Sequence, residues 1–478
     1  MNAIVRHGPH DLRHRPRHSP RPGPRPDPQS GEPPLAGASI KALGHSTTRT
    51  LERHFGDVVN VKGFGALGNG SNNDTAAIQL ALDYAFGTAG SPHGGSIDEG
   101  TAGVFLNRQV FFPAGKYIIT APLTLPSLRG AHIFGAGRFT TTIQNITPNG
   151  SVFVTNGCEY SVFERMNLMS SYPAGTGCCF DLNRIGSPSV NLQSNTFRDL
   201  YLEGGGYGIR IGEGNTMGSE NVIMNCYFAG NAIAGVATRN PNALANQIYG
   251  GNFASCGKAI HATSAGGSIP IIHGVSFQNQ VTADIYIEYS SGDMYSIAGC
   301  RNESSVSGGI FTWLASGASA HITGCSQLSH ANSIFARCEL GSPGNGAGSL
   351  TIDSCVSPTG TINGNGYLYI RGNPDRAKPI AITGAASNGV PNLIRLAVTS
   401  TANWSSGQLH WIAGIVGSGN VAALNGGYRT LTVIDGTHAD VVGSTFSGAW
   451  TSGGVVDGQS FGNPAYLSSF GGVVVQNI

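Results

Sequence analysis

The chain has 478 residues, of which 11% are charged and 71 are glycine. Glycine is about twice as frequent as its average share of roughly 7%, which favours turn-dense β structure and argues against an all-α fold. The formal net charge of +1 argues against a nucleic acid partner, because phosphate binding needs a clustered basic face.

The cysteine and hydropathy patterns argue against a disulfide scaffold, a metal site and a membrane protein. Nine cysteines are scattered without a paired CxxC pattern, so we expect buried free thiols, no metal site and no cofactor. No apolar run reaches the roughly 18 residues that span a bilayer, and the amino terminus lacks the apolar core of a secretory signal. We therefore expect no membrane partner, and export by a route such as virion release.

Residues 1–44 are rich in Pro, Arg and His, with seven Lys/Arg against three Asp/Glu and little that is apolar. Such a composition cannot bury a core and predicts a disordered tail. The segment is interpreted either as a solvated tail or as an arm that contacts an adaptor or nucleic acid.

Order is predicted from residue 45 onward, with residues 57–103 forming a cap that contains a short helix. Asp74 precedes apolar residues at helical spacing, so its carboxylate is predicted to cap the helix by accepting backbone N–H groups. The glycines before it fit no phosphate-binding motif and are interpreted as turn residues.

A longer string carries a resemblance to a known family. VVNVKGFGALGNGSNNDTAAIQLALDYA, followed by VFFPAGKYIITAPLTL and IFGAGRFTTTI, resembles the opening of pectate-lyase-superfamily domains over residues 57–145. It departs at Asn73, where the family often has a second acidic residue. The resemblance implies a right-handed parallel β-helix capped by the short helix. Similarity to phage tailspikes and tail fibres implies a homotrimer, a phage tail or baseplate partner, and a surface polysaccharide ligand.

The middle of the chain supports the same fold through an internal repeat. Segments such as FRDLYL, IMNCYF and IHGVSF recur between residues 163 and 352 with spacings of 34, 26, 25, 24, 25, 25 and 30. A period of this length indicates a solenoid whose coils bury one continuous core. We therefore predict an all-β fold with a parallel β-helix over residues 45–385.

Each repeat also predicts side-chain directions. The first, fourth and sixth residues should point inward, and the fourth column stacks small thiols at Cys226, Cys300, Cys325 and Cys355. The third residue should form the bend between two strands, because Gly, Asn and Asp tolerate left-handed backbone. This column contains Arg165, Asp199, Asn225, Gly250, Gly274, Gly299, Gly324 and Ser354.

A second apolar column predicts an outward face. It contains Ile209, Val236, Ile260, Ile285, Ile310 and Ile334. If side chains alternate strictly, the residues that follow form ladders on coils about 4.8 Å apart, where aromatic rings could cover sugar rings. The alternative is that a neighbouring subunit covers this face. The predicted substrate-binding residues are Arg239, His261, Tyr286, Phe311 and Trp313.

Candidate catalytic residues follow from the same register. Glycoside hydrolysis needs two carboxyl groups, about 5–5.5 Å or 6.5–9.5 Å apart. We predict Glu288 as acid or base, with Asp284 or Glu303 as partner. A lyase would instead need a base and a cation, for which Arg239, Arg301 and His261 are candidates. Motifs typical of polygalacturonases and calcium-dependent pectate lyases are not evident.

The period fails after about residue 385. Residues 386–460 alternate short β-like runs with turns and predict a small barrel or sandwich, followed by a tail at 461–478. The string ALNGGYRTLTVIDGTHADVVGSTF resembles a small β-barrel module of ubiquitin-activating enzymes and phage tail proteins, which implies a role in attachment or assembly. Asp435 and His438 are interpreted as turn formers within it.

Two functions are consistent with these patterns. One is a tailspike-like hydrolase or lyase that binds and cleaves bacterial surface polysaccharide. The other is a noncatalytic tail-fibre adhesin or structural subunit on the same fold. A carboxylate pair at catalytic separation would favour the enzyme, and the expected location is a virion tail or the extracellular space.

Overall fold

The computed structural model describes residues 58–88, 108–171, 175–183, 191–213, 218–288, 292–303, 309–315, 317–327, 334–338, 349–355, 380–389, 391–402, 404–425 and 427–456. Strands at 39–40, 49–50, 91–92, 361–364, 367–371 and 472–476 are described by their backbone. Apart from those strands, the predicted tails at 1–44 and 461–478 lie outside the described residues. Within these ranges, no helix has the length and apolar character needed to cross a membrane.

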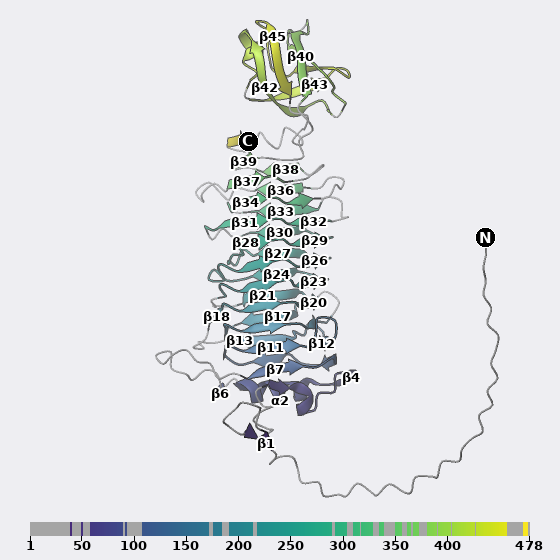
Figure 1. The fold of residues 1–478 in the computed structure, drawn as a ribbon, viewed down its shortest axis with the longest axis vertical. Coiled ribbons are helices and arrows are strands. Elements are labelled where there is room, and N and C mark those ends of the chain that lie inside the picture. Colours follow the sequence, from purple (N-terminus) through teal and green to yellow (C-terminus); the bar gives the residue numbers. More distant parts are fainter. Residues whose placement is uncertain are drawn as a thin grey trace, which may run out of the picture. The chain divides into compact units, whose positions relative to one another are not determined.

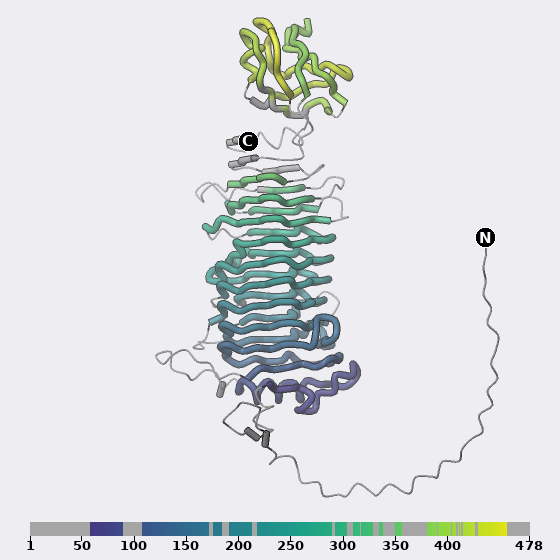
Figure 2. The backbone as a smooth tube through the Cα atoms, viewed as in Figure 1, coloured from purple at the N-terminus to yellow at the C-terminus, as the bar shows by residue number. Residues whose placement is uncertain are grey.

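The larger body is a parallel β-solenoid in which each coil passes through three sheets in turn (Figures 1 and 2). The predicted parallel β-helix is therefore confirmed. Sheet 1 contains β3 (Val58–Asn60), β7 (Gln109–Phe112), β11 (His132–Gly135), β15 (Val162–Glu164), β19 (Thr196–Arg198), β22 (Val222–Met224), β25 (Gln247–Tyr249), β28 (Ile271–His273), β31 (Met294–Ala298), β34 (Ser319–Thr323), β37 (Ser349–Asp353), β39 (Tyr367–Arg371) and β46 (Gly472–Gln476).

The other two sheets run beside it along the solenoid. Sheet 2 contains β4 (Asn69–Asn73), β8 (Gly115–Ile119), β12 (Thr141–Asn145), β16 (Asn167–Met169), β20 (Tyr201–Glu203), β23 (Tyr227–Ala229), β26 (Asn252–Ala254), β29 (Ser276–Gln278), β32 (Arg301–Asn302) and β35 (Ser326–Gln327). Sheet 3 contains β9 (Leu123–Leu125), β13 (Phe153–Asn156), β17 (Cys178–Asn183), β21 (Tyr207–Glu213), β24 (Ala234–Thr238), β27 (Lys258–Ala262), β30 (Ala283–Ile287), β33 (Ile310–Leu314), β36 (Ile334–Cys338) and β38 (Thr361–Gly364).

Smaller elements complete this part of the chain. A short parallel row contains β10 (Leu128–Arg129), β14 (Cys158–Glu159) and β18 (Leu192–Gln193). Two antiparallel pairs join β1 (Ser39–Ile40) to β2 (Arg49–Thr50) and β5 (Gly87–Thr88) to β6 (Ser91–Pro92). The helical elements are the 3-10 turn η2 (Val61–Phe64) and the helix α2 (Thr75–Phe86).

Helix α2 forms where the sequence predicts it and buries the expected apolar stripe against the solenoid core. Asp74 is its N-cap residue, but the Asp74 side chain makes no capping hydrogen bond, so that detail of the prediction is wrong. The carboxylate instead accepts the N–H groups of Leu67 and Gly68, at 2.7 and 3.2 Å, because the preceding glycine-rich turn brings them closer. Asn73 accepts the first helical N–H, at 3.0 Å.

The predicted bend column is confirmed. All eight of its residues have φ angles between 50° and 67°, the left-handed region. From Arg165 to Gly324, each of these bends turns the chain from sheet 1 into sheet 2 within two residues, as at 165–166 and 199–200. The backbone requirement of this corner therefore fixes the register of these coils.

The core contains stacked aromatic rings and thiols. Phe228, Phe253 and Phe277 occupy successive coils with ring centroids 4.3 and 5.7 Å apart. The same inward column continues with Asn302 and Gln327, which are also buried. The predicted thiol column is buried and free, and burial raises the pKa of Cys226 to about 12. The core thus becomes more polar in the later coils.

The carboxy-terminal body is a closed antiparallel barrel with its own apolar core. Its first strand starts at Ile380, inside the range predicted for the solenoid. The Asp435 carboxylate lies 2.9 Å from Nδ1 of His438 within a turn. The barrel contains β40 (Ile380–Ser387), β41 (Ile394–Val398), β42 (Gln408–Gly417), α3 (Gly419–Ala422), β43 (Gly427–Val433), β44 (His438–Val441) and β45 (Trp450–Val456).

Candidate functional site

The outer face of sheet 3 carries a ladder of side chains in register from coil to coil. His261 stacks on Tyr286 with ring centroids 5.2 Å apart, and Tyr286 lies 4.5 Å from Trp313. The guanidinium of Arg337 lies 4.4 Å from the centre of the Trp313 ring. The structure thus brings three predicted binding residues together. The full ladder is Arg210, Ala237, His261, Tyr286, Trp313 and Arg337.

Each ring in this ladder covers a face of its neighbour. Tyr286 lies between His261 on the preceding coil and Trp313 on the following coil. Arg337 lies over Trp313 on the following coil, so Tyr286 and Trp313 each have a neighbour on both sides. A sugar ring therefore has no open face of these two rings to lie on, and recognition falls to the neighbouring charges.

Glu288 follows strand β30, and its carboxylate forms a hydrogen bond with His261 of the ladder. Its Oε2 lies 2.8 Å from Nε2 of His261 and accepts the backbone N–H of Ser264 at 3.2 Å. Burial raises the pKa of Glu288, but the hydrogen bond from His261 and others outweigh it, so the pKa lies below its usual value. Burial lowers the pKa of His261. A neutral imidazole therefore lies beside an ionised carboxylate at neutral pH.

Two polar contacts extend this face toward earlier coils. Arg210 donates two hydrogen bonds to the carboxylate of Asp181, at 3.0 and 2.7 Å. Arg239, a predicted binding residue, donates to the hydroxyl of Tyr207 at 3.2 Å. These contacts hold both guanidinium groups in place, which lowers the entropy cost of binding a ligand.

Among the side chains that the structure describes on this face, cations outnumber carboxylates. Lys258, whose ammonium lies 5.4 Å from the centre of the Tyr286 ring, adds to the cations. Asp181 and Arg337 were not predicted as site residues. They lie one coil before Arg210 and one coil after Trp313, so extending the outward-facing columns by one coil at each end would have found them. The cationic side chains are Arg210, Arg239, Lys258 and Arg337, and the carboxylates are Asp181 and Glu288.

Two predicted site residues point into the core instead of outward. Asp284 is 2% exposed and Phe311 is 0% exposed. Both occupy a column where the regular pairing between coils is interrupted, since Ala283 pairs with Ile310 and Ile285 with Thr312. Two consecutive residues therefore face inward on each strand. The prediction that Asp284 and Phe311 face outward is wrong, because side chains do not alternate strictly on these strands. The predicted apolar column also aligned Ile310 with Ile285, whereas Ile285 pairs with Thr312.

The three predicted carboxylates do not meet. Asp284 accepts a hydrogen bond from the side chain of Asn302 inside the core, and burial raises its pKa well above the usual value. Glu303 follows β32 in sheet 2, where its Oε1 lies 2.5 Å from Arg301. Glu288 belongs to sheet 3. The predicted catalytic pair is therefore not assembled. In the described ranges, no group of three or more His, Cys, Asp or Glu side chains could hold a metal ion.

Sheet 1 carries a charged cluster that was not predicted. The carboxylate of Glu164, which is 4% exposed, accepts from Arg198 and lies 2.9 Å from Nε2 of His132 and 3.4 Å from Arg165. Burial raises the pKa of Glu164, but the bonds from Arg198 and His132 outweigh it, so the pKa is lowered. Because one buried carboxylate holds all three partners, the cluster is best explained as a structural lock beside the bend at Arg165.

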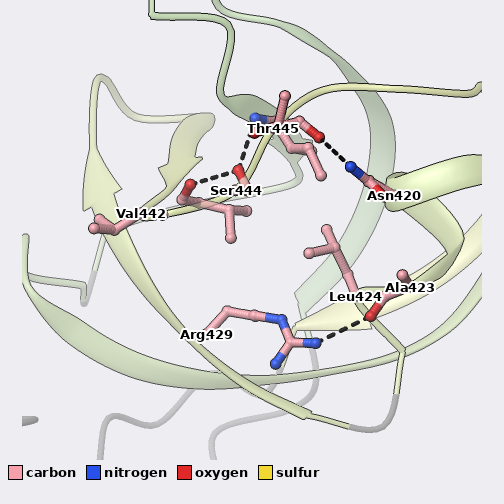
Figure 3. A pocket seen from close by; sticks show the side chains of 10 residues that line it. Asn420, Ala423, Leu424, Arg429, Val442, Ser444 and Thr445 are labelled. Carbon is pink, nitrogen blue, oxygen red and sulfur yellow. Dashed lines mark hydrogen bonds between the residues drawn. The ribbon is translucent and has the colours of Figure 1, made fainter.

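The barrel has a pocket of about 300 Å³ (Figure 3). Its charged lining residue is Arg429, which donates to the carbonyl of Ala423 at 3.0 Å. Asn420 donates to the carbonyl of Thr445 at 2.9 Å on the opposite side. Leu424 supplies an apolar wall. A guanidinium beside apolar surface has the chemistry to bind a small carboxylate.

Comparison with known proteins identifies the start of the solenoid. Residues 58–177 match the family model described as rhamnogalacturonase A/epimerase, pectate lyase-like. Over these residues the chain is similar to a pectate-lyase-like domain. Mannuronan C5-epimerase AlgE2 of Azotobacter vinelandii is 39% identical over 92 residues, which are 18% of this chain and 7% of that epimerase. The chain thus spans less than a tenth of the length of this relative.

Solved structures with a similar outline include two viral proteins. Geobacillus virus E2 ORF18 is 15% identical, with a TM-score of 0.38 over 84% of this chain and 77% of that chain. Tailspike protein 2 of Escherichia coli O157:H7 bacteriophage CAB120 is 12% identical, with a TM-score of 0.33 over 81% of this chain and 58% of that chain.

Proposed function

We propose that the chain binds an acidic polysaccharide on the outer face of sheet 3. The observation that carries the proposal is the excess of cationic side chains on this face, in a chain whose net charge is only +1. Guanidinium and ammonium groups bind carboxylates through charge-assisted hydrogen bonds. Coils about 4.8 Å apart can offer such groups to successive sugar units. The pectate-lyase-like domain and its similarity to a mannuronan epimerase support this ligand class.

Replacing Arg239 and Lys258 together by glutamine should weaken binding to an acidic polymer by roughly a hundredfold, since each charge-assisted hydrogen bond contributes about 1.5–3 kcal/mol. Calorimetric titration with polygalacturonate and with alginate measures this loss. Binding by the parental chain should also weaken at high salt, because salt screens exposed charges. The matched control replaces the exposed Lys62 and Lys116 near the helical cap, which removes the same charge elsewhere.

The outcome separates two errors. If neither polymer binds the parental chain, the ligand is not an acidic polysaccharide. If the Arg239 and Lys258 variant binds as tightly as the Lys62 and Lys116 control, the ligand lies on another face.

Cleavage of the bound polymer is a second candidate function, favoured by the pectate-lyase-like domain. If Glu288 is a catalytic acid or base, Glu288→Gln should retain polymer binding but lose at least about a hundredfold in turnover, because general acid–base catalysis contributes roughly 10²–10⁴-fold. New reducing ends and the ultraviolet absorbance of unsaturated uronates measure hydrolysis and elimination separately. Cleavage at the parental rate would remove Glu288 from the reaction. A parental chain that cleaves neither polymer would favour the noncatalytic adhesin.

The biological setting stays part of this proposal. The sequence resemblance to tailspikes and tail fibres supports a bacterial surface polysaccharide as the natural ligand and a virion tail or extracellular location. A homotrimer and a tail or baseplate partner follow from the same resemblance and stay predictions. The barrel pocket, where Arg429 lies beside Leu424, supports attachment contacts on that body.

A further inference from the structure

One corner of the solenoid is built differently from the others. Five residues, 136–140, join β11 to β12, whereas later coils make this turn with two residues, such as 165–166. Arg138 in this loop donates to the carbonyl of Asn225, 3.2 Å away in the bend three coils further along. The loop therefore lies along the corner and is held there by a long-range hydrogen bond.

The loop presents an aromatic ring to solvent. Phe139 is 77% exposed, although its ring centroid lies only 5.9 Å from that of Tyr201 on the outer face of sheet 2. Tyr201 stacks on Tyr227 of the next coil at 4.8 Å. Tyr286 and Trp313 of sheet 3 have neighbours on both sides, whereas Phe139 keeps most of its surface open, with the Arg138 guanidinium 5.5 Å from its ring centre. Exposed aromatic surface of this kind suits the apolar faces of sugar rings.

A pocket of about 150 Å³ opens on sheet 2, where Glu203 follows Tyr201 by two residues on the same face of β20. Gln144 and Glu203 line it two coils apart, roughly 9.6 Å between backbones, with Met169 between them. Ala229 follows on the next coil, where its small side chain leaves space. Among the described residues, neither the Gln144 amide nor the Glu203 carboxylate has a hydrogen-bond partner. Two polar side chains without hydrogen-bond partners thus lie on either side of the apolar Met169. We call the pocket lined by the following residues the sheet-2 pocket: Gln144, Met169, Ser170, Glu203, Gly204, Ala229 and Gly230.

The polar groups beside the tyrosine pair are also incompletely bonded. The amide oxygens of Asn167 and Asn252, which flank Tyr201 and Tyr227 in the same column, are buried without a hydrogen-bond partner in the described part of the chain. Buried polar atoms are normally hydrogen-bonded, so such atoms need a bound molecule or water to complete them.

We infer that the sheet-2 pocket, together with Phe139, binds a neutral sugar unit of a hexose-containing glycan. The Glu203 carboxylate can accept two neighbouring hydroxyl groups, and the Gln144 amide can both donate and accept. Because the charged group that lines the pocket is a carboxylate, a uronate would be repelled where a neutral hexose is not. This site is separate from the acidic-polymer face of sheet 3 and does not depend on it.

Three surface variants test this site. Glu203→Gln and Phe139→Ala should each weaken binding roughly tenfold or more, and Ala229→Met should block the pocket by filling it. The probes are fluorescently labelled maltohexaose, cellohexaose and mannohexaose, with fluorescence anisotropy as the readout. Tyr160→Ala, which removes a 51% exposed ring elsewhere, is the matched control. Circular dichroism and the melting temperature confirm that each variant is folded.

The expected result is that at least one neutral probe binds the parental chain and the Tyr160→Ala control equally, and binds all three pocket variants more weakly. The Arg239 and Lys258 double variant should bind this probe normally, which separates the sheet-2 pocket from the proposed function. The inference is wrong if none of the three probes binds, or if Glu203→Gln and Phe139→Ala bind like the parental chain.

Discussion

Replacing Phe253 by alanine should lower the free energy of unfolding by about 3–5 kcal/mol, the range measured for large-to-small changes of buried aromatic residues. Phe253 is fully buried and stacks between Phe228 and Phe277, at 4.3 and 5.7 Å between ring centroids. Its loss would leave a cavity that the neighbouring coils cannot close without moving their own stacked rings. Urea unfolding followed by intrinsic fluorescence measures the change.

The control for this experiment is Tyr160→Ala, which removes a half-exposed ring and should change stability by less than about 0.5 kcal/mol. A similar small change for Phe253→Ala would show that the aromatic column does not hold adjacent coils together.

Asp284→Asn should stabilise the chain increasingly as the pH rises above about 4. Burial raises the pKa of Asp284 well above its usual value, so the folded chain keeps a proton that the unfolded chain releases. Stability from this group is complete below the ordinary pKa of about 3.9 and is lost as the pH rises toward the folded pKa. The loss is about 1.4 kcal/mol per pH unit across this window. Asparagine keeps the shape and cannot ionise.

Melting temperatures of both chains, measured from about pH 4, the ordinary pKa of the carboxyl group, up to neutral pH, provide the measurement. The difference between the two chains should grow with pH and be smallest near pH 4. A difference that does not vary with pH would mean that Asp284 titrates alike in the folded and unfolded chain. Asp284 would then be no different from an exposed carboxylate.

The outer faces of the solenoid differ in the chemistry they offer. Sheet 3 presents ring edges among an excess of cations, whereas the sheet-2 pocket has a carboxylate beside an exposed aromatic ring. On sheet 1, the buried Glu164 carboxylate is already engaged by Arg198, Arg165 and His132. A polysaccharide with both charged and neutral units could therefore contact two faces of one solenoid. The two sets of variants distinguish these contacts, because each removes groups from a single sheet.

Much of the fold could be predicted from the sequence because its determinants are local and repeat. A bend with left-handed backbone recurs at Arg165, Asp199 and Gly250, and the buried residues around it keep the same offsets from coil to coil. The short helix was predicted from the spacing of its buried side chains. The small barrel was predicted from the change of period after the last coil.

The functional surfaces were decided by tertiary structure. Asp284 and Phe311 turn inward because the pairing of sheet 3 is interrupted, and a period-two pattern cannot show such an interruption. The ring faces of Tyr286 and Trp313 are closed by neighbours from other coils. The sheet-2 pocket depends on residues 25 or more positions apart and on the reach of Arg138 to Asn225, 87 residues away. Sequence alone thus determined the coil and its register, while the side chains that a ligand can reach were decided by contacts between coils.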